Sequence, residues 1–135
     1  MVKIMNYYEY GDDKIDVLDR VLSLISTREY DDALECIDNL NSKEFNDPLL
    51  LMSKAQCLLR LNEKEEAYGI YKQAIELCDE KLKVKKDPFV LNIKGNCNLI
   101  LKDYIKAIEC YDEALDIDDK NSLAISFKAV ALFRL

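Results

Sequence analysis

Short polar side chains recur along the chain at places where a helix could begin. They are Asp13, Asp47, Asp87 and Asn121, and successive members are 34, 40 and 34 residues apart. The oxygen atoms of such side chains accept hydrogen bonds from the unpaired N–H groups of a first helical turn. Two of the four precede a proline, which is favoured at the first helical position. This spacing predicts a helical unit that repeats along the chain.

The repeat divides the chain into three full units and one half unit. The full units are residues 14–47, 48–81 and 88–121; residues 82–87 extend the second unit, and residues 122–135 form the half unit. Apolar residues follow the helical period within the units, and the alternating pattern of strands is absent. We therefore predict an all-α fold with seven helices, at residues 14–26, 30–41, 48–61, 64–84, 88–101, 104–117 and 122–134.

Small residues mark the places where two helices could approach closely. Counted from the first residue of each unit, position 8 is mostly small and position 20 is always alanine: Val21, Ala55, Gly95 and Ala129, then Ala33, Ala67 and Ala107. Positions 24 and 27 are tyrosine and alanine in the last two full units: Tyr71 and Tyr111, then Ala74 and Ala114. This pattern, from Lys14 to the C-terminus, resembles the tetratricopeptide repeat. The resemblance implies an α-solenoid of antiparallel helix pairs, whose first helices line a concave groove.

Basic residues depart from the family pattern at position 7, where the family usually has leucine. The four residues are Arg20, Lys54, Lys94 and Lys128. We interpret them as packing residues whose methylene stems cover apolar surface while their charges reach water. A second basic feature, residues 81–86, is expected to continue the second helix of its repeat into solvent. A docking patch for an acidic partner is the alternative for that run.

The five cysteines fit packing better than chemistry. Two pairs recur at the same repeat position, Cys57 with Cys97 and Cys36 with Cys110, and the chain has no histidine and no CxxC motif. Free cysteine behaves as a small hydrophobic residue. We therefore expect no metal site and no cofactor. With no histidine base and no glycine-rich phosphate loop, we also expect no catalytic residues and no enzyme.

Charge and hydropathy exclude two further classes of partner. The net charge is −7 and no basic stripe follows a predicted helix, which argues against nucleic acid. No apolar run is long enough to cross a membrane, and the N-terminus lacks a signal peptide, so we expect a cytoplasmic protein with no membrane partner. Residues 1–13 are expected to form an N-terminal tail or a strap over the first helix; docking into a neighbour's groove is the alternative.

The groove positions that the resemblance implies contain apolar and amide side chains. Family members that capture chaperone C-termini use lysine, arginine and asparagine there. Neither register of this chain supplies a cation: the first offers Leu18, Leu22, Ser53, Phe89 and Ile93, and the second offers Met52, Gln56, Ile93, Leu123 and Phe127. We therefore predict a scaffold or adaptor that binds an apolar peptide segment, without a carboxylate clamp. The predicted contact residues are Met52, Gln56, Arg60, Phe89, Asn92, Asn96 and Phe127.

The C-terminal half repeat supports a second hypothesis. Ten of the fourteen residues in 122–135 are apolar, and a first helix normally packs against its own second helix. The apolar surface should be covered, either because the chain is a fragment of a longer array or because two copies form a homodimer. In the homodimer, Phe127, Val130 and Phe133 would lie near a two-fold axis. The alternative function is thus a self-assembly or structural module that oligomerises through this helix.

Overall fold

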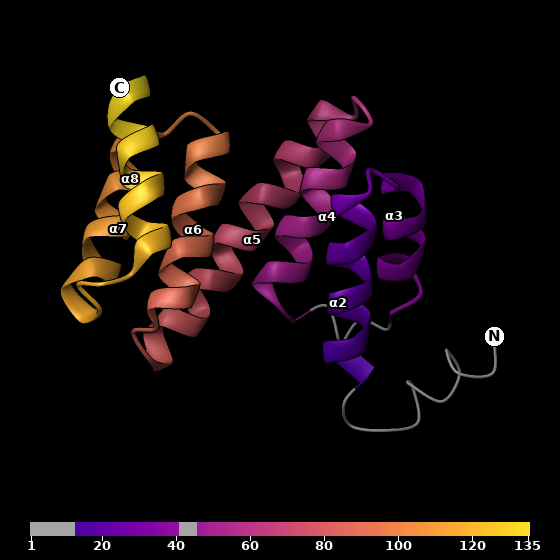
Figure 1. Ribbon diagram of the computed structural model, residues 1–135, viewed down its shortest axis with the longest axis horizontal. Helices are drawn as coiled ribbons and strands as arrows, with labels where there is room; N and C mark the ends of the chain where they lie inside the picture. Colours follow the sequence, from indigo (N-terminus) through magenta and orange to yellow (C-terminus); the bar gives the residue numbers. More distant parts are fainter. Residues whose placement is uncertain (1–12, 41–45) are drawn as a thin grey trace. The chain divides into compact units, whose positions relative to one another are not determined.

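Seven helices and no strand make up the part of the chain that the computed structural model describes, residues 13–40 and 46–135 (Figure 1). They are α2 (Asp13–Ser26), α3 (Tyr30–Asp38), α4 (Pro48–Arg60), α5 (Lys64–Val84), α6 (Pro88–Ile100), α7 (Tyr104–Ile117) and α8 (Ser122–Arg134). The predicted all-α fold is confirmed, and each predicted boundary lies within three residues of the observed one. The predicted tail or strap lies outside the described residues, apart from Asp13 at the start of α2.

The helices form two compact units, the first ending at Ala67 and the second beginning at Tyr68. In the first unit, α2, α3 and α4 enclose a core of Val17, Val21, Ala33, Ile37, Leu40, Leu50 and Cys57. In the second unit, α7 packs against both α6 and α8. The alanines predicted at close helix contacts, Ala107 and Ala114, have no exposed surface there. A larger side chain would separate the helices at these points.

Three of the four predicted helix caps are present. The carboxylate of Asp47 accepts a hydrogen bond from the Leu49 N–H at 2.9 Å, and that of Asp87 accepts one from the Phe89 N–H at 2.9 Å. The amide oxygen of Asn121 accepts one from the Ala124 N–H at 3.1 Å. The side chain of Asp13 is outside the described part of the structure. These side chains therefore cap the start of α4, α6 and α8 by accepting hydrogen bonds from first-turn N–H groups, as predicted.

The first helix of each full repeat ends in the same backbone turn. Arg28, Asn62 and Lys102 occupy position 15 of their repeats and have positive φ angles of 65°, 68° and 67°. In each turn the next residue's N–H donates to a carbonyl five residues back, as from Asp103 to Asn98 at 2.9 Å. The left-handed residue donates three residues back, and together these bonds form a Schellman motif. The motif reverses the chain, so that α3, α5 and α7 begin at position 17 of their repeats.

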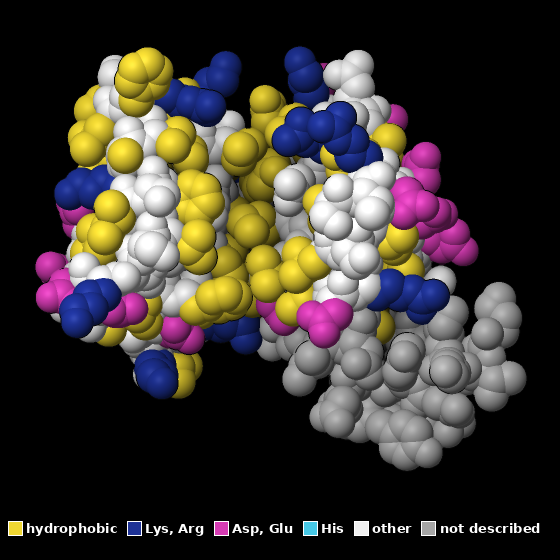
Figure 2. All heavy atoms as spheres, in the orientation of Figure 1, with side chains coloured by type: hydrophobic (Ala, Val, Ile, Leu, Met, Phe, Trp, Pro, Cys, Tyr) yellow, Lys and Arg dark blue, Asp and Glu magenta, His cyan; other side chains and the backbone are white. Residues whose placement is uncertain are grey.

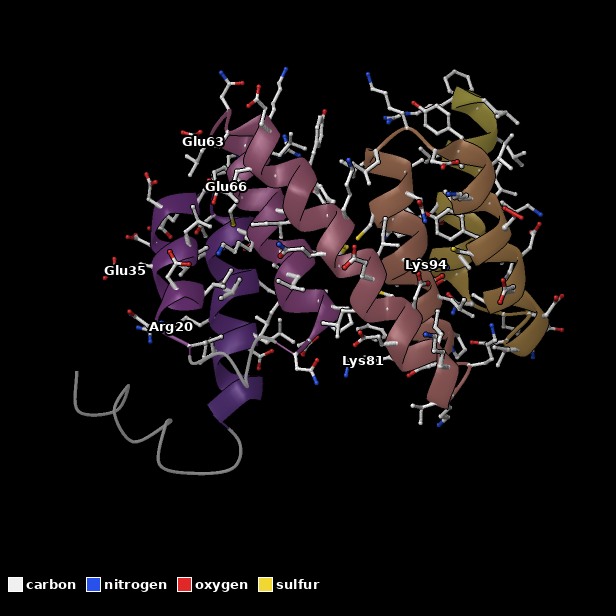
Figure 3. All side chains as sticks on the ribbon, turned by 180° about the vertical axis from the view of Figure 1, so that it is seen from behind. Arg20, Glu35, Glu63, Glu66, Lys81 and Lys94 are labelled. Atoms are coloured by element: carbon white, nitrogen blue, oxygen red, sulfur yellow. The ribbon has the colours of Figure 1, made fainter. Side chains whose placement is uncertain are left out.

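Three of the four basic residues at position 7 form ion pairs, which the sequence interpretation did not include. Lys54 pairs with Asp38 at 3.5 Å, Lys94 with Asp79 at 2.6 Å and Lys128 with Asp112 at 2.6 Å. Each lysine thus binds an aspartate on the second helix of the preceding repeat. Figure 3 shows Lys94 on α6 reaching toward α5.

The six-residue insertion explains why one of these pairs differs from the others. Asp38 and Asp112 both occupy position 25, but the second repeat has Lys72 at that position. Lys94 instead pairs with Asp79, seven residues further along α5, which is about two helical turns. The predicted continuation of this helix into the basic run is confirmed as far as Val84. Beyond it, Lys86 pairs with Glu113 of α7 at 3.3 Å.

Candidate functional site

Tyr111 of α7 contacts two other helices of the second unit, α6 and α8. The buried ring of Tyr111, on α7, lies over Gly95 of α6, so closely that a Cβ on Gly95 would be 2.9 Å from the tyrosine Cδ1 and nearer still to Cε1. Its hydroxyl donates a 2.6 Å hydrogen bond to Oδ1 of Asn96. On α8, the ring of Phe127 stacks against it with centroids 6.1 Å apart. Burial raises the pKa of Tyr111, so the hydroxyl stays a donor at physiological pH.

A second amide cluster joins α6 to the start of α8. The Asn92 side chain is buried, and its Nδ2 donates a 3.1 Å hydrogen bond to Oδ1 of Asn121. The same oxygen of Asn121 caps α8. The Oδ1 atom of Asn92 is buried and has no hydrogen-bond partner within the described residues. An unsatisfied buried acceptor is unfavourable, so a donor supplied there would be stabilising.

Around these amides, α6 and α8 present an apolar surface. We define the α6–α8 surface by Phe89 and Asn96 on α6 and by Leu123, Phe127 and Val130 on α8. Phe89 and Leu123, each at the second position of its repeat, are more than half exposed, whereas Asn96 and Phe127 are half-buried. Figure 2 shows exposed hydrophobic side chains along α8. Apolar area of this kind, beside hydrogen-bonding amides, suits a peptide with apolar side chains.

The predicted contact residues are divided between the two units. Phe89, Asn92, Asn96 and Phe127 belong to the second unit, on the contacting helices α6 and α8. The other three, Met52, Gln56 and Arg60, all lie on α4 in the first unit, with Met52 and Gln56 half-buried and Arg60 exposed. Sequence reasoning missed Tyr111 and Asn121 as partners of the amides. The signal for Asn121 was its predicted role as the cap of α8. The same side chain also reaches Asn92 on α6, the first helix of the preceding repeat.

The thiols are not poised for chemistry. Cys57, Cys78, Cys97 and Cys110 are buried, and none of the five cysteines forms a disulfide. Burial raises the pKa of Cys57 and of Cys110 to about 11 and that of Cys78 to about 12. A thiol with such a pKa is protonated at neutral pH and is a poor nucleophile and metal ligand.

No group of three or more histidine, cysteine or acidic side chains in the described residues is arranged to hold a metal ion. None of the helices described is long and apolar enough to cross a membrane.

Solved structures with the same arrangement of helices are tetratricopeptide-repeat domains and type III secretion chaperones. The first such domain of human RPAP3 is 15% identical, with a TM-score of 0.63 over 93% of this chain and 94% of that chain. A structure described as the first TPR of Spaghetti (RPAP3) bound to HSP90 peptide SRMEEVD is also 15% identical, with a TM-score of 0.58 over 92% and 94%. The Yersinia enterocolitica chaperone SycD, in complex with a peptide of the translocator YopD, is 14% identical, with a TM-score of 0.55 over 93% and 96%.

These likenesses establish the fold. No curated protein matches the chain. The family model described as anaphase-promoting complex, cyclosome, subunit 3 matches residues 26–114, which is more than half of the chain. The chain is therefore a tetratricopeptide-repeat protein that belongs to the anaphase-promoting complex, cyclosome, subunit 3 family.

Proposed function

We propose that the protein is a scaffold or adaptor that binds an apolar peptide segment at the α6–α8 surface. The observation that carries the proposal is the exposure of Phe89 and Leu123 beside the amides of Asn92 and Asn96. Apolar ligand side chains would cover the exposed rings and aliphatic groups. The amide nitrogen of the half-buried Asn96 is suited to a carbonyl group of a peptide backbone.

The predicted contact residues Met52, Gln56 and Arg60 lie on α4 in the first unit, where we propose them as peptide contacts of that unit. Their support is the resemblance to tetratricopeptide grooves, in which the first helix of each repeat contributes. Structures of similar fold hold peptides, as SycD does with its YopD peptide. We infer a binding role without catalysis, in the cytoplasm, because the buried thiols are protonated and free cysteines persist in a reducing compartment.

A carboxylate clamp does not fit this surface. The position-7 lysines on α6 and α8 already pair with Asp79 and Asp112, so their charges are compensated within the chain. The α6–α8 surface itself contains no cation. An acidic C-terminal peptide would therefore lose the hydration of its carboxylates without gaining an ion pair.

The test uses peptides selected from a random twelve-residue phage library against the full chain. Selected peptides should be rich in apolar residues, and Phe89→Ala should weaken their binding about tenfold, because burial of a phenylalanine side chain contributes ~1.5–3 kcal/mol. The matched control is Ile105→Ala, which removes an exposed apolar side chain of α7. Binding should be measured by calorimetry, with the heptapeptide SRMEEVD as a negative control.

Two results would refute the proposal. One is tight binding of SRMEEVD, since it would require a cationic site elsewhere. The other is a set of selected peptides that lose affinity with Ile105→Ala but not with Phe89→Ala. Asn96→Ala is not a clean test, because it would also leave the buried Tyr111 hydroxyl without its acceptor.

Self-association through α8 is the second candidate function. It is supported by Phe133, which is 92% exposed, and by the partly exposed Val130. Phe127, the third predicted residue, is half-buried against Tyr111, so Phe133→Glu alone is the better variant. A homodimer that this variant converts to monomer, seen by light scattering, would favour self-assembly.

A further inference from the structure

Hydrogen bonds fix the orientation of the Asn121 side chain. The backbone N–H of Ala124 donates to its Oδ1 atom at 3.1 Å, and a backbone N–H can only donate, so this end of the amide is the oxygen. The Nδ2 atom of Asn92 donates to the same oxygen at 3.1 Å. Both lone pairs of that oxygen are therefore used within the chain. The Nδ2 atom of Asn121 is left with no partner among the described residues.

The hydroxyl of Tyr111 fixes the Asn96 side chain in the same way. This hydroxyl belongs to a fully buried residue and donates to Oδ1 of Asn96 at 2.6 Å. With the amide turned over, the hydroxyl would lose this acceptor, which is costly inside a protein. The oxygen of Asn96 therefore bonds to α7, and its Nδ2 atom has no partner in the part of the chain that the structure describes.

Both unpaired amide nitrogens are accessible from the surface. Among the described residues, the buried side-chain polar atom that lacks a hydrogen-bond partner is Oδ1 of Asn92. The half-buried residues Asn96 and Asn121 contribute no such buried atom, so their free Nδ2 groups are open to a ligand. The amides thus use their oxygens within the protein and present N–H groups at the α6–α8 surface.

The side chains around these N–H groups do not balance them. Phe89, Leu123, Phe127 and Val130 are apolar and offer no acceptor. The hydroxyl of Ser126 on α8 can donate as well as accept, so it does not change the balance. The α6–α8 surface therefore combines apolar area with an excess of uncharged hydrogen-bond donors.

An excess of donors favours a ligand with an excess of acceptors. Most residues of a peptide bring one backbone N–H and one carbonyl, but proline keeps the carbonyl and has no N–H. A proline over this surface therefore leaves no peptide N–H buried without an acceptor, which would weaken binding. In the polyproline II conformation the carbonyls have no internal hydrogen bonds and remain available. The carbonyls of an α-helix, in contrast, are bonded within the helix.

We propose that the α6–α8 surface selects a proline-rich apolar segment of a partner protein, bound in the polyproline II conformation. Its carbonyls accept hydrogen bonds from the Nδ2 groups of Asn96 and Asn121, and its proline rings pack on the exposed Phe89 and Leu123. Tyr111 acts as a positioning residue, because its hydroxyl holds the Asn96 amide in the donating orientation. This inference rests on the proposed peptide-binding function and names the chemical class of its ligand.

The probes are three labelled twelve-residue peptides with acetylated N-termini and amidated C-termini, titrated with the full chain and followed by fluorescence anisotropy. One consists of Leu-Pro-Pro repeats, the second has alanine in place of each proline, and the third has N-methylalanine there. The proline peptide should bind at least about fivefold more tightly than the alanine peptide, whose N–H groups lose water without gaining an acceptor. The N-methyl peptide should also bind more tightly than the alanine peptide, because it lacks the same N–H groups.

Two variants of the chain replace an outward N–H group by an oxygen without removing the inward oxygen. Asn96→Asp keeps an acceptor for the Tyr111 hydroxyl, and Asn121→Asp keeps a capping side chain of the kind that Asp87 provides at α6. Each should weaken binding of the proline peptide about tenfold, because a peptide carbonyl loses its donor. The matched control is Gln73→Glu on α5, which makes the same chemical change at an exposed residue and should leave the affinity unchanged.

Tyr111→Phe tests the positioning role. Without the hydroxyl, the Asn96 amide is free to turn its oxygen outward and accept from a peptide N–H. The preference for the proline peptide over the alanine peptide should therefore fall toward one. A loss of stability alone would weaken both peptides equally and leave this ratio unchanged.

Three results would overturn this inference: no binding of the proline peptide, an alanine peptide that binds as tightly, or an affinity that neither Asn96→Asp nor Asn121→Asp changes. If circular dichroism shows that one variant is unfolded, the other variant and the three peptides on the wild-type chain still decide. Phe89→Ala separates the two proposals. Selected peptides that are insensitive to it refute the proposed function, whereas peptides that need Phe89 but show no preference for proline refute this inference alone.

Discussion

Gly69 and Gly95 both lie inside helices, but their surroundings give opposite expectations for substitution. Gly95→Ala should destabilise the fold by ~1–3 kcal/mol, because the buried Tyr111 ring is held by Asn96 and Phe127 and has little room to move. A Cβ on Gly69 meets no atom within 4 Å, so Gly69→Ala should stabilise by roughly 0.5–1 kcal/mol through helix propensity. Urea unfolding of both variants provides the measurement. Equal effects would contradict the contact between α6 and α7.

The sequence could predict small residues at close contacts but not their polar partners. Gly95 and Ala107 recur at fixed repeat positions, and packing alone determines their size. The hydrogen bond from Tyr111 to Asn96 depends on two side chains from different helices, fifteen residues apart. Likewise, the ion pairs of Lys54, Lys94 and Lys128 join neighbouring repeats, and the insertion changes which aspartate is within reach. A periodicity argument fixes the face of a helix, but not its axial register against a neighbour.

At the scale of the helical element, the three turns at position 15 use residues that are poorly suited to them. A left-handed conformation costs a non-glycine residue roughly 1–2 kcal/mol. Replacement by glycine would remove this cost. Because glycine loses more conformational entropy on folding, roughly 0.4–1 kcal/mol of the resulting gain in stability would be offset. Lys102→Gly should therefore raise the free energy of unfolding by about 0.5–1 kcal/mol.

The matched control for this prediction is Asn62→Gly. Asparagine tolerates the left-handed region better than lysine, so its replacement should gain less. The measurement is the midpoint of urea unfolding for each variant. A loss of stability in Lys102→Gly would show that the turn is not the Schellman motif described above. The absence of glycine at these turns also explains why the sequence predicted their places but not their geometry.

At the scale of the whole molecule, the helices were predictable because capping residues and apolar periodicity agree in every repeat, and prolines reinforce them in two. The arrangement of a binding site across repeats was not predictable in the same way. Met52 and Gln56 belong to the first unit and Phe89 to the second. Their spacing in the sequence assigns each to the first helix of its repeat. It says nothing of the rotation between repeats.

The buried thiols make the stability of the whole chain sensitive to alkaline pH. Their pKa values in the folded state, about 11 for Cys57 and Cys110 and about 12 for Cys78, lie above the ordinary thiol value of about 8.5. Between these limits the folded state holds more protons than the unfolded state. The stabilisation is fully present below the ordinary thiol pKa and is lost as pH rises toward the folded values.

Lys94 changes stability in the same direction. Burial opposes its charge, but the hydrogen bond and the charge of Asp79 outweigh burial and raise its pKa. The free energy of unfolding should therefore be level from neutral pH to about 8.5 and then decline, by up to ~1.4 kcal/mol per pH unit for each titrating thiol. Urea titrations followed by far-ultraviolet circular dichroism across this range would measure the slope. Cys57→Ala removes one of these protons, so its slope should be shallower than that of the wild type. A wild-type stability that stays constant across this alkaline range would mean that the thiols are accessible to water in the folded protein.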